Sequence, residues 1–145
     1  MKKSDNHMKL YLPSLSVNEG LARQAVASFI AQLNPTIEEI SDIKCAVSEA
    51  VTNSVIHGYD NRGGIIEIAA TIEKDTLEIK ITDYGKGIED IDKAMEPMYT
   101  TDAEHERSGM GFTFMEVFMD ELKVFSDKGK GTTIVMKKTF GVNEE

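Results

Sequence analysis

The stretch Ser48-Glu49-Ala50-Val51-Thr52-Asn53-Ser54-Val55-Ile56-His57-Gly58 predicts the last turns of a helix. Glu49 and Asn53 are four residues apart, so they lie on one face of that helix, one turn above the other. Val47 and Val51 point the other way, toward a core. The polar pair is therefore on the flank of a buried helix, where it is either satisfied within the protein or used in function.

Capping boxes mark the starts of two helices in the first half of the chain. Ser16-Val17-Asn18-Glu19 starts the first helix, which continues to about Leu33 and is ended by Asn34-Pro35. Thr36-Ile37-Glu38-Glu39 starts the second helix, which runs through the opening stretch to Gly58. Helical spacing predicts the inward faces, with Leu21, Ala25, Ser28 and Phe29 in the first helix and Ile40, Ile43, Val47, Ala50 and Val51 in the second.

Alternation of apolar and polar residues predicts the strands, which cover Lys9–Pro13, Ile66–Ile72, Leu77–Ile81, Leu122–Phe125 and Thr132–Met136. The first of them is placed at a sheet edge, which is a common pairing surface between subunits. A short helix over Ile91–Met95 and a further helix opening at Gly109-Met110-Gly111 complete the pattern. This element order predicts a two-layer α/β sandwich, with a mixed, mostly antiparallel sheet and the helices on one face.

Composition limits the class of protein. A chain of 145 residues with 41% hydrophobic and 28% charged residues is expected to form a single domain over residues 1–145. The formal net charge of −9 argues against direct nucleic-acid binding, which needs clustered Lys and Arg. Cys45 is the single cysteine, so neither a disulfide within the chain nor a zinc cluster is indicated. Because no apolar run is long enough to span a membrane, we expect a cytoplasmic protein.

Two glycine motifs lie on the predicted loops. Asp83-Tyr84-Gly85-Lys86-Gly87 follows a strand, and Gly109-Met110-Gly111 opens a helix. The chain contains no Walker A sequence, and the second motif lacks the third glycine and the preceding strand of a dinucleotide fingerprint. The first motif is similar to the DFG motif of protein kinases, but no His-Arg-Asp catalytic loop accompanies it. Each motif alone is also consistent with a simple turn, so the combination carries the interpretation.

In combination, these segments resemble the split nucleotide site of the GHKL superfamily, which includes gyrase, Hsp90, histidine kinases and MutL. The residues that carry the resemblance are Ser48–Asn53 for the N box, Asp83–Ile88 and Arg107–Phe112 for the two glycine boxes, and Gly131–Thr133 for the final box. Leu21-Ala22-Arg23 and Met98-Tyr99-Thr100-Thr101 narrow the resemblance to the anti-sigma serine kinases of sporulating bacteria. It covers nearly the whole chain and implies the Bergerat ATP-binding fold.

The resemblance implies ATP, ADP and Mg²⁺ as ligands. Asn53 would offer an amide oxygen to Mg²⁺, and Asp83 would accept a hydrogen bond from the adenine amino group. Gly109 and Gly111 would present helix N–H groups to the phosphates, where Arg107 would donate to the γ-phosphate. The implied nucleotide-binding residues are Asn53, Asp83, Gly85, Gly87, Thr100, Thr101, Arg107, Ser108, Gly109, Met110, Gly111 and Thr133.

Glu49 is the implied catalytic residue. The superfamily's ATPases use a glutamate here to activate water, and in an anti-sigma kinase the same carboxylate would accept the proton of a protein serine. The resemblance thus implies a homodimeric serine kinase whose ATP-bound form holds a sporulation sigma factor in the forespore. Its phosphorylation substrate would be an anti-anti-sigma protein. Arg23 matches a family arginine that contacts both protein partners.

Three alternatives share parts of this pattern. A general stress anti-sigma kinase would use the same chemistry with a different sigma factor. A module that binds ATP and sigma without kinase activity would have no use for Glu49. A detached ATP domain of a histidine kinase would transfer phosphate to histidine and give an acid-labile product.

Overall fold

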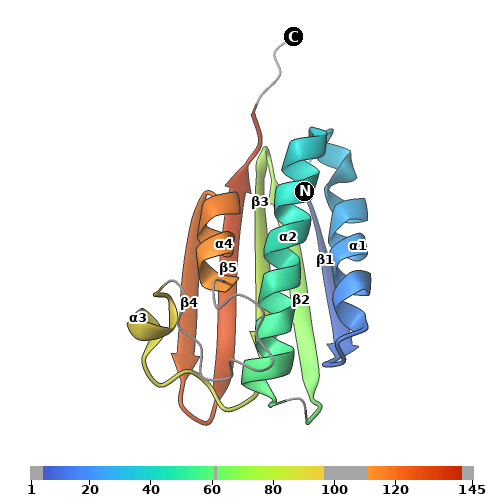
Figure 1. The fold of residues 1–145 in the computed structure, drawn as a ribbon. Coiled ribbons are helices and arrows are strands. Elements are labelled where there is room, and N and C mark those ends of the chain that lie inside the picture. The colour runs from blue at the N-terminus through green and yellow to red at the C-terminus, as the bar shows by residue number, and fades with distance from the viewer. Residues whose placement is uncertain (1–4, 61, 97–110, 142–145) are drawn as a thin grey trace.

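The computed structural model describes residues 5–60, 62–96 and 111–141. The strands are β1 (Asn6–Pro13), β2 (Ile65–Glu73), β3 (Thr76–Asp83), β4 (Glu121–Asp127) and β5 (Gly131–Thr139). The helices are α1 (Asn18–Ile30), η1 (Ala31–Leu33), α2 (Ile37–Asn53), η2 (Ser54–Gly58), α3 (Ile91–Ala94) and α4 (Gly111–Phe118). Figure 1 shows α1, α2 and α4 on one face of the five-stranded sheet. The predicted two-layer α/β sandwich is confirmed.

The sheet has the strand order β1-β2-β3-β5-β4, with β1 at an edge as predicted. Each of these four neighbouring pairs is antiparallel, so the prediction of a mixed sheet is wrong. The reason lies in the helical hairpin of α1 and α2. It returns the chain to the sheet end at which β1 finished, where Pro13 pairs with Ile65, and β2 must then run in the opposite direction.

The core lies between the helices and the sheet. Alternate residues of the central strands face the helices and are fully buried, including Ile68, Ile79 and Met136. From α2, Ile43 and Val47 pack against them, as the helical spacing predicts. Each such aliphatic side chain contributes about 1.5–3 kcal/mol through burial. Within the described ranges, no helix has the length and apolar character needed to cross a membrane.

The predicted inward face of α1 is displaced by one residue. Ala22, Val26 and Ile30 are fully buried, whereas Leu21 is 52% exposed. Both sets of residues are apolar or small and recur at four-residue intervals, so the helical period alone does not choose between them. The rotation of α1 about its axis is selected by its packing against α2 and the sheet.

The two capping boxes have different outcomes. At the start of α2 the box is formed, because Thr36 Oγ1 accepts from the Glu39 N–H at 3.0 Å and the Glu39 side chain accepts from the Thr36 N–H at 2.8 Å. At the start of α1 the prediction is wrong. Val17 is the N-cap residue there, without a side-chain cap, and the Glu19 carboxylate pairs with Arg23 instead.

Replacing Thr36 with alanine should therefore lower the free energy of unfolding by about 1 kcal/mol, because the Glu39 N–H loses its acceptor. The matched variant Ser16→Ala should change it by less than about 0.5 kcal/mol, since α1 has no side-chain cap. Urea unfolding of both variants measures the difference. An equal or larger loss for Ser16→Ala would show that the first box forms in solution.

Candidate functional site

Asp83, the last residue of β3, is a buried carboxylate. Strand alternation turns it toward the helical layer, as it does Ile81, and only 2% of Asp83 is exposed. Ser54 Oγ donates to Asp83 Oδ2 at 3.0 Å, and the Gly85 N–H donates to Oδ1 at 3.0 Å. Burial raises the pKa of the Asp83 carboxyl above its ordinary value of 3.8, and hydrogen bonds from Gly85, Ser54 and the Thr132 backbone counteract part of this increase.

The C-terminal end of α2 changes to a π-helix at η2 (Ser54–Gly58), a feature that the sequence did not predict. The Tyr59 N–H donates to the Ser54 carbonyl at 3.0 Å, five residues back. The wider turn brings Gly58 against the carboxylate of Asp83. A Cβ at Gly58 would lie 2.8 Å from the Asp83 carboxyl carbon, so this approach requires glycine. Single π-turns of this kind are frequent at functional sites.

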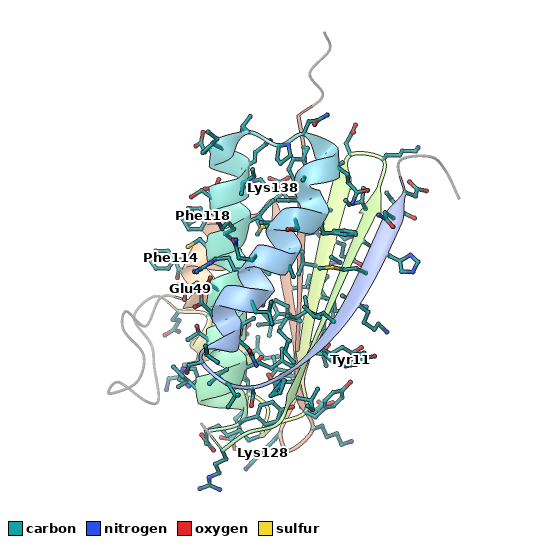
Figure 2. The ribbon with its side chains drawn as sticks, turned by 90° about the vertical axis from the view of Figure 1, so that its right-hand side faces the viewer. Tyr11, Glu49, Phe114, Phe118, Lys128 and Lys138 are labelled. Carbon is teal, nitrogen blue, oxygen red and sulfur yellow. The ribbon has the colours of Figure 1, made fainter. Side chains whose placement is uncertain are left out.

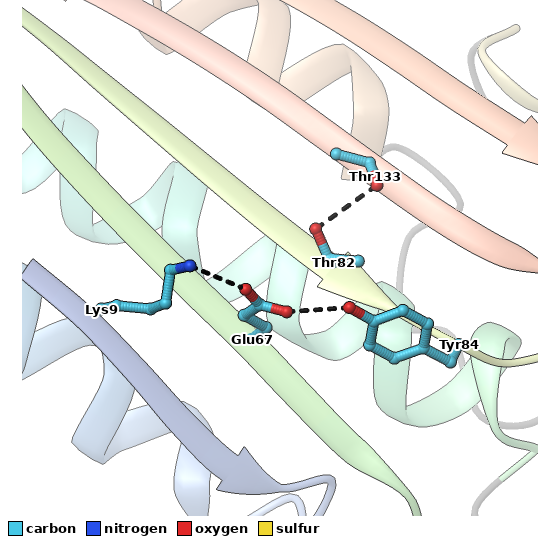
Figure 3. A network of polar contacts seen from close by, with 5 residues as sticks. All are labelled: Lys9, Glu67, Thr82, Tyr84 and Thr133. Carbon is cyan, nitrogen blue, oxygen red and sulfur yellow. Dashed lines mark hydrogen bonds and ion pairs between the residues drawn. The ribbon is translucent and has the colours of Figure 1, made fainter.

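The final box contributes Thr132 to the site and not Thr133, which corrects the prediction. Thr132 pairs with Asp83 across β3 and β5, is buried, and exchanges a hydrogen bond with Ser126 Oγ at 2.8 Å. Thr133 lies on the opposite face of the sheet, where its hydroxyl is 3.3 Å from that of Thr82 (Figure 3). Adjacent strand residues point to opposite faces, so a displacement of one residue moves the side chain out of the site.

The glycines of the first glycine box make room for neighbouring backbone. A Cβ at Gly85 would overlap the carbonyl of Gly58, and a Cβ at Gly87, which has a φ of +78°, would overlap the carbonyl of Asp127. The Lys86 N–H between them donates to the Gly58 carbonyl at 2.9 Å. The two glycines therefore hold this loop against η2 and the hairpin of β4 and β5. Their contact with a nucleotide stays a prediction.

A cavity of about 1500 Å³ lies on the helical side of the molecule next to this loop. Within the described residues, its lining includes Glu49, Asn53, Gly87, Gly111 and Thr132. These residues come from α2, the first glycine box, α4 and the final box. This volume is larger than the roughly 300–1000 Å³ typical of a small-molecule site.

Glu49 and Asn53 occupy the expected flank of α2. Both are partly buried and line the cavity, while Val51 behind them is buried in the core. In Figure 2, Glu49 is on the helical side of the molecule.

Burial raises the pKa of the nearby Cys45 thiol, and the carboxylates of Glu49 and Asp42 raise it further. Cys45 is therefore a neutral thiol on the flank of α2.

Arg23 connects α1 to the residue that precedes Glu49. Its Nη1 donates to Glu19 Oε2 at 2.9 Å within α1, and to Ser48 Oγ of α2 at 3.3 Å. Ser48 immediately precedes Glu49, and all four residues line the same cavity. The residue expected to bind a protein partner and the expected catalytic carboxylate thus line one cavity.

Helix α4 is anchored at the end away from the cavity. Lys138 Nζ donates to the Phe118 carbonyl at 2.9 Å, which places a cation at the helix C-terminus, where the helix dipole favours positive charge. Both residues are labelled in Figure 2. The Thr139 N–H also donates to Asp120 Oδ2 at 2.7 Å. These bonds to β5 determine where the first residue of α4, Gly111, meets the cavity.

The remaining predicted residues, Thr100, Thr101, Arg107, Ser108, Gly109 and Met110, lie outside the described ranges. Conversely, sequence reasoning missed Ser54, Gly58, Ser126 and Thr132. Counting back in twos from the apolar Ile134 would have indicated Thr132, because both residues must face the core. No local pattern indicates the bond of Ser54 to Asp83 or that of the Ile88 N–H to Ser126, since these partners are 29 and 38 positions apart.

The raised pKa of Asp83 predicts the pH dependence of stability. The folded state binds the proton of the Asp83 carboxyl more tightly than the unfolded state does. The stabilisation of the fold by this bound proton is therefore complete below the ordinary pKa of 3.8, and it is lost as the pH rises through the folded-state pKa. The unfolding free energy of the wild type minus that of Asp83→Asn should therefore fall with increasing pH. Urea unfolding between about pH 4 and pH 7 measures this difference. A difference that rises with pH would mean that hydrogen bonding outweighs burial.

Comparison with known proteins assigns the family. The histidine kinase-like ATPase domain matches residues 12–138. The catalytic domain of the histidine kinase ThkA has the same fold, with a TM-score of 0.57 over 93% of this chain and 96% of that chain, at 13% identity. Anti-sigma F factors are far more similar. The anti-sigma F factor of Clostridium acetobutylicum is 57% identical over 97% of this chain and 99% of the relative. The anti-sigma F factor of Clostridium botulinum strain Alaska E43 is 61% identical over 95% of this chain and 97% of the relative. The chain belongs to the histidine kinase-like ATPase family and, within it, to the anti-sigma F factors.

Proposed function

We propose that this chain is an ATP-dependent protein serine kinase that also sequesters a sporulation sigma factor. One observation carries the proposal. A single cavity is lined by Glu49, Asn53 and Arg23, together with Gly58 and Thr132, which border the buried Asp83. This supports a nucleotide site, a candidate base and a candidate protein-docking residue along one cavity.

The residues of the adenine end fit a purine with an exocyclic amino group. Asp83 accepts hydrogen bonds from Ser54, Gly85 and the backbone of Thr132, and a carboxylate has about four lone pairs, so one remains for a ligand. Gly58 and Thr132, which border Asp83, both line the cavity. Thr132 replaces Thr133 as the proposed contact from the final box.

The phosphate end is proposed from residue chemistry. Asn53 lines the cavity one helical turn from Glu49, and its amide oxygen suits Mg²⁺, a cation that prefers oxygen ligands and keeps several waters. Gly111 begins α4 and lines the cavity, and the N–H groups of a first helical turn suit phosphates. Thr100, Thr101, Arg107, Ser108, Gly109 and Met110 remain proposed contacts of the nucleotide. When bound, Mg-ATP supplies the transferable γ-phosphoryl group.

The chemical role of this chain is to orient and deprotonate the acceptor. The serine Oγ forms a bond to the γ-phosphorus, the bond from that phosphorus to the bridging oxygen of ADP breaks, and the serine proton passes to the Glu49 carboxylate. Arg23, fixed by Glu19 and Ser48, would dock the polypeptide that carries this serine. ADP keeps the electron pair of the broken bond.

Sigma binding is proposed from membership of the anti-sigma F factors. A sporulation sigma factor, sigma F, would dock on the ATP-bound form at Arg23 and be displaced by the unphosphorylated anti-anti-sigma protein. The exposed edge of β1 offers a surface for a homodimer. The forespore is the compartment in which this function would operate.

Replacing Glu49 with glutamine should lower the rate of phosphate transfer to the anti-anti-sigma protein by about 100-fold, because the acceptor loses its base. ATP affinity should stay within about twofold, which separates chemistry from binding. Labelled ATP with acid treatment of the product measures the transfer, since phosphoserine survives acid and phosphohistidine does not.

The matched control is Glu38→Gln, which changes an exposed glutamate at the other end of α2. It should transfer phosphate at the wild-type rate. If the wild type labels no serine while still binding ATP, the protein is a binding module. If Glu49→Gln is as fast as the wild type, another group accepts the proton.

The nucleotide should select the protein partner. With Mg-ATP, immobilised protein is expected to retain the sigma factor, and with Mg-ADP it should release it. Arg23→Ala should lose sigma binding while its unfolding free energy falls by less than about 1 kcal/mol, because its bonds to Glu19 and Ser48 are partly exposed. Mass spectrometry of the retained proteins identifies sigma F or a general stress sigma factor. Equal retention with both nucleotides would contradict the proposal.

A further inference from the structure

Tyr59 follows η2 and joins three segments through one hydroxyl group. Its Oη donates to the carbonyl of Ile65 at 2.7 Å and accepts the N–H of Tyr84 at 2.7 Å. Ile65 is the first residue of β2, and Tyr84 directly follows Asp83. The phenol therefore connects the end of the α2 segment to the start of β2 and to the first glycine box.

The bond to Tyr84 acts on the backbone next to Asp83. A second bond, from the Lys86 N–H to the Gly58 carbonyl at 2.9 Å, ties the same two segments together two residues further on. Between these bonds lies Gly85, whose N–H donates to Asp83 Oδ1. The backbone of the box is thus held on both sides of the group that orients the carboxylate.

The ring of Tyr59 is fixed as well. It packs partly against the hydrophobic core, and a Cβ at Gly64 would overlap it. Because the ring is held by packing, removal of the hydroxyl alone leaves a phenylalanine in the same place. The hydrogen bonds can then be tested separately from the packing.

We propose that Tyr59 is a positioning residue for the adenine pocket. Its hydroxyl sets the backbone at Tyr84, and through it the direction of the Asp83 carboxylate, without contact to the nucleotide. The inference rests on the proposed adenine-nucleotide site and adds a determinant of base recognition that lies behind it. It concerns the base only, since the phosphate end is formed by α2 and α4.

The test compares ADP with GDP on Tyr59→Phe. Guanine has a carbonyl oxygen in place of the amino group that Asp83 would accept, so GDP gains no hydrogen bond from a well-directed carboxylate. ADP affinity should fall about tenfold, the effect of one or two lost hydrogen bonds, while GDP affinity stays within about twofold. The KM for ATP in phosphate transfer should rise by the same factor as the Kd of ADP, with kcat unchanged.

The ratio of the two affinities is independent of the folded fraction, because both nucleotides are measured on one sample by calorimetry. The control is Tyr11→Phe, which removes an exposed hydroxyl on the uncovered face of the sheet and should leave the ratio unchanged. An unchanged ADP to GDP ratio in Tyr59→Phe overturns the inference and leaves the proposed function intact. A wild type without preference for ADP overturns the proposed site itself.

Discussion

The site depends on the burial of one carboxylate. Asp83 is almost inaccessible, and an ionised carboxylate in such a place is costly unless its oxygens accept hydrogen bonds. The donors come from three different segments, namely Ser54 of η2, the Gly85 N–H of the following loop, and the backbone of Thr132 in β5. Each donor also fixes the segment that carries it. The carboxylate therefore organises the end of α2, the first glycine box and the central strands around one point.

Helix α2 serves two purposes on two faces. One face supplies Ile43, Val47 and Val51 to the core, and the flank carries Glu49 and Asn53 to the cavity. A regular α-helix would continue this arrangement past Asn53. The change to a π-helix redirects the chain, so that Ser54 and Gly58 both reach Asp83. The wider turn thus leads the chain into contact with the end of a distant strand.

Sequence reasoning succeeded where a pattern is local. The four-residue spacing of Glu49 and Asn53 and the capping box at Thr36 require only a helix, and both are present. It failed where two local patterns compete. Leu21 and Ala22 begin equivalent apolar stripes on α1, of which only the second is buried. Ser16 and Glu19 match the sequence of a capping box, but the Glu19 carboxylate pairs with Arg23 and the box does not form. The free-energy differences between such alternatives are small, and packing decides among them.

The sequence by itself determined the order of the elements, the sandwich of helices on one face of a sheet, and the family with its glycine boxes. These follow from periods of 3.6 and 2 residues and from motifs that a nucleotide site requires. Only the tertiary structure decided that Thr132 and not Thr133 faces the site, that α2 ends in a π-turn, and that Tyr59 connects three segments. The reason is that strand register and long-range hydrogen bonds join residues far apart in the chain, such as Ser54 and Asp83, which are separated by 29 positions.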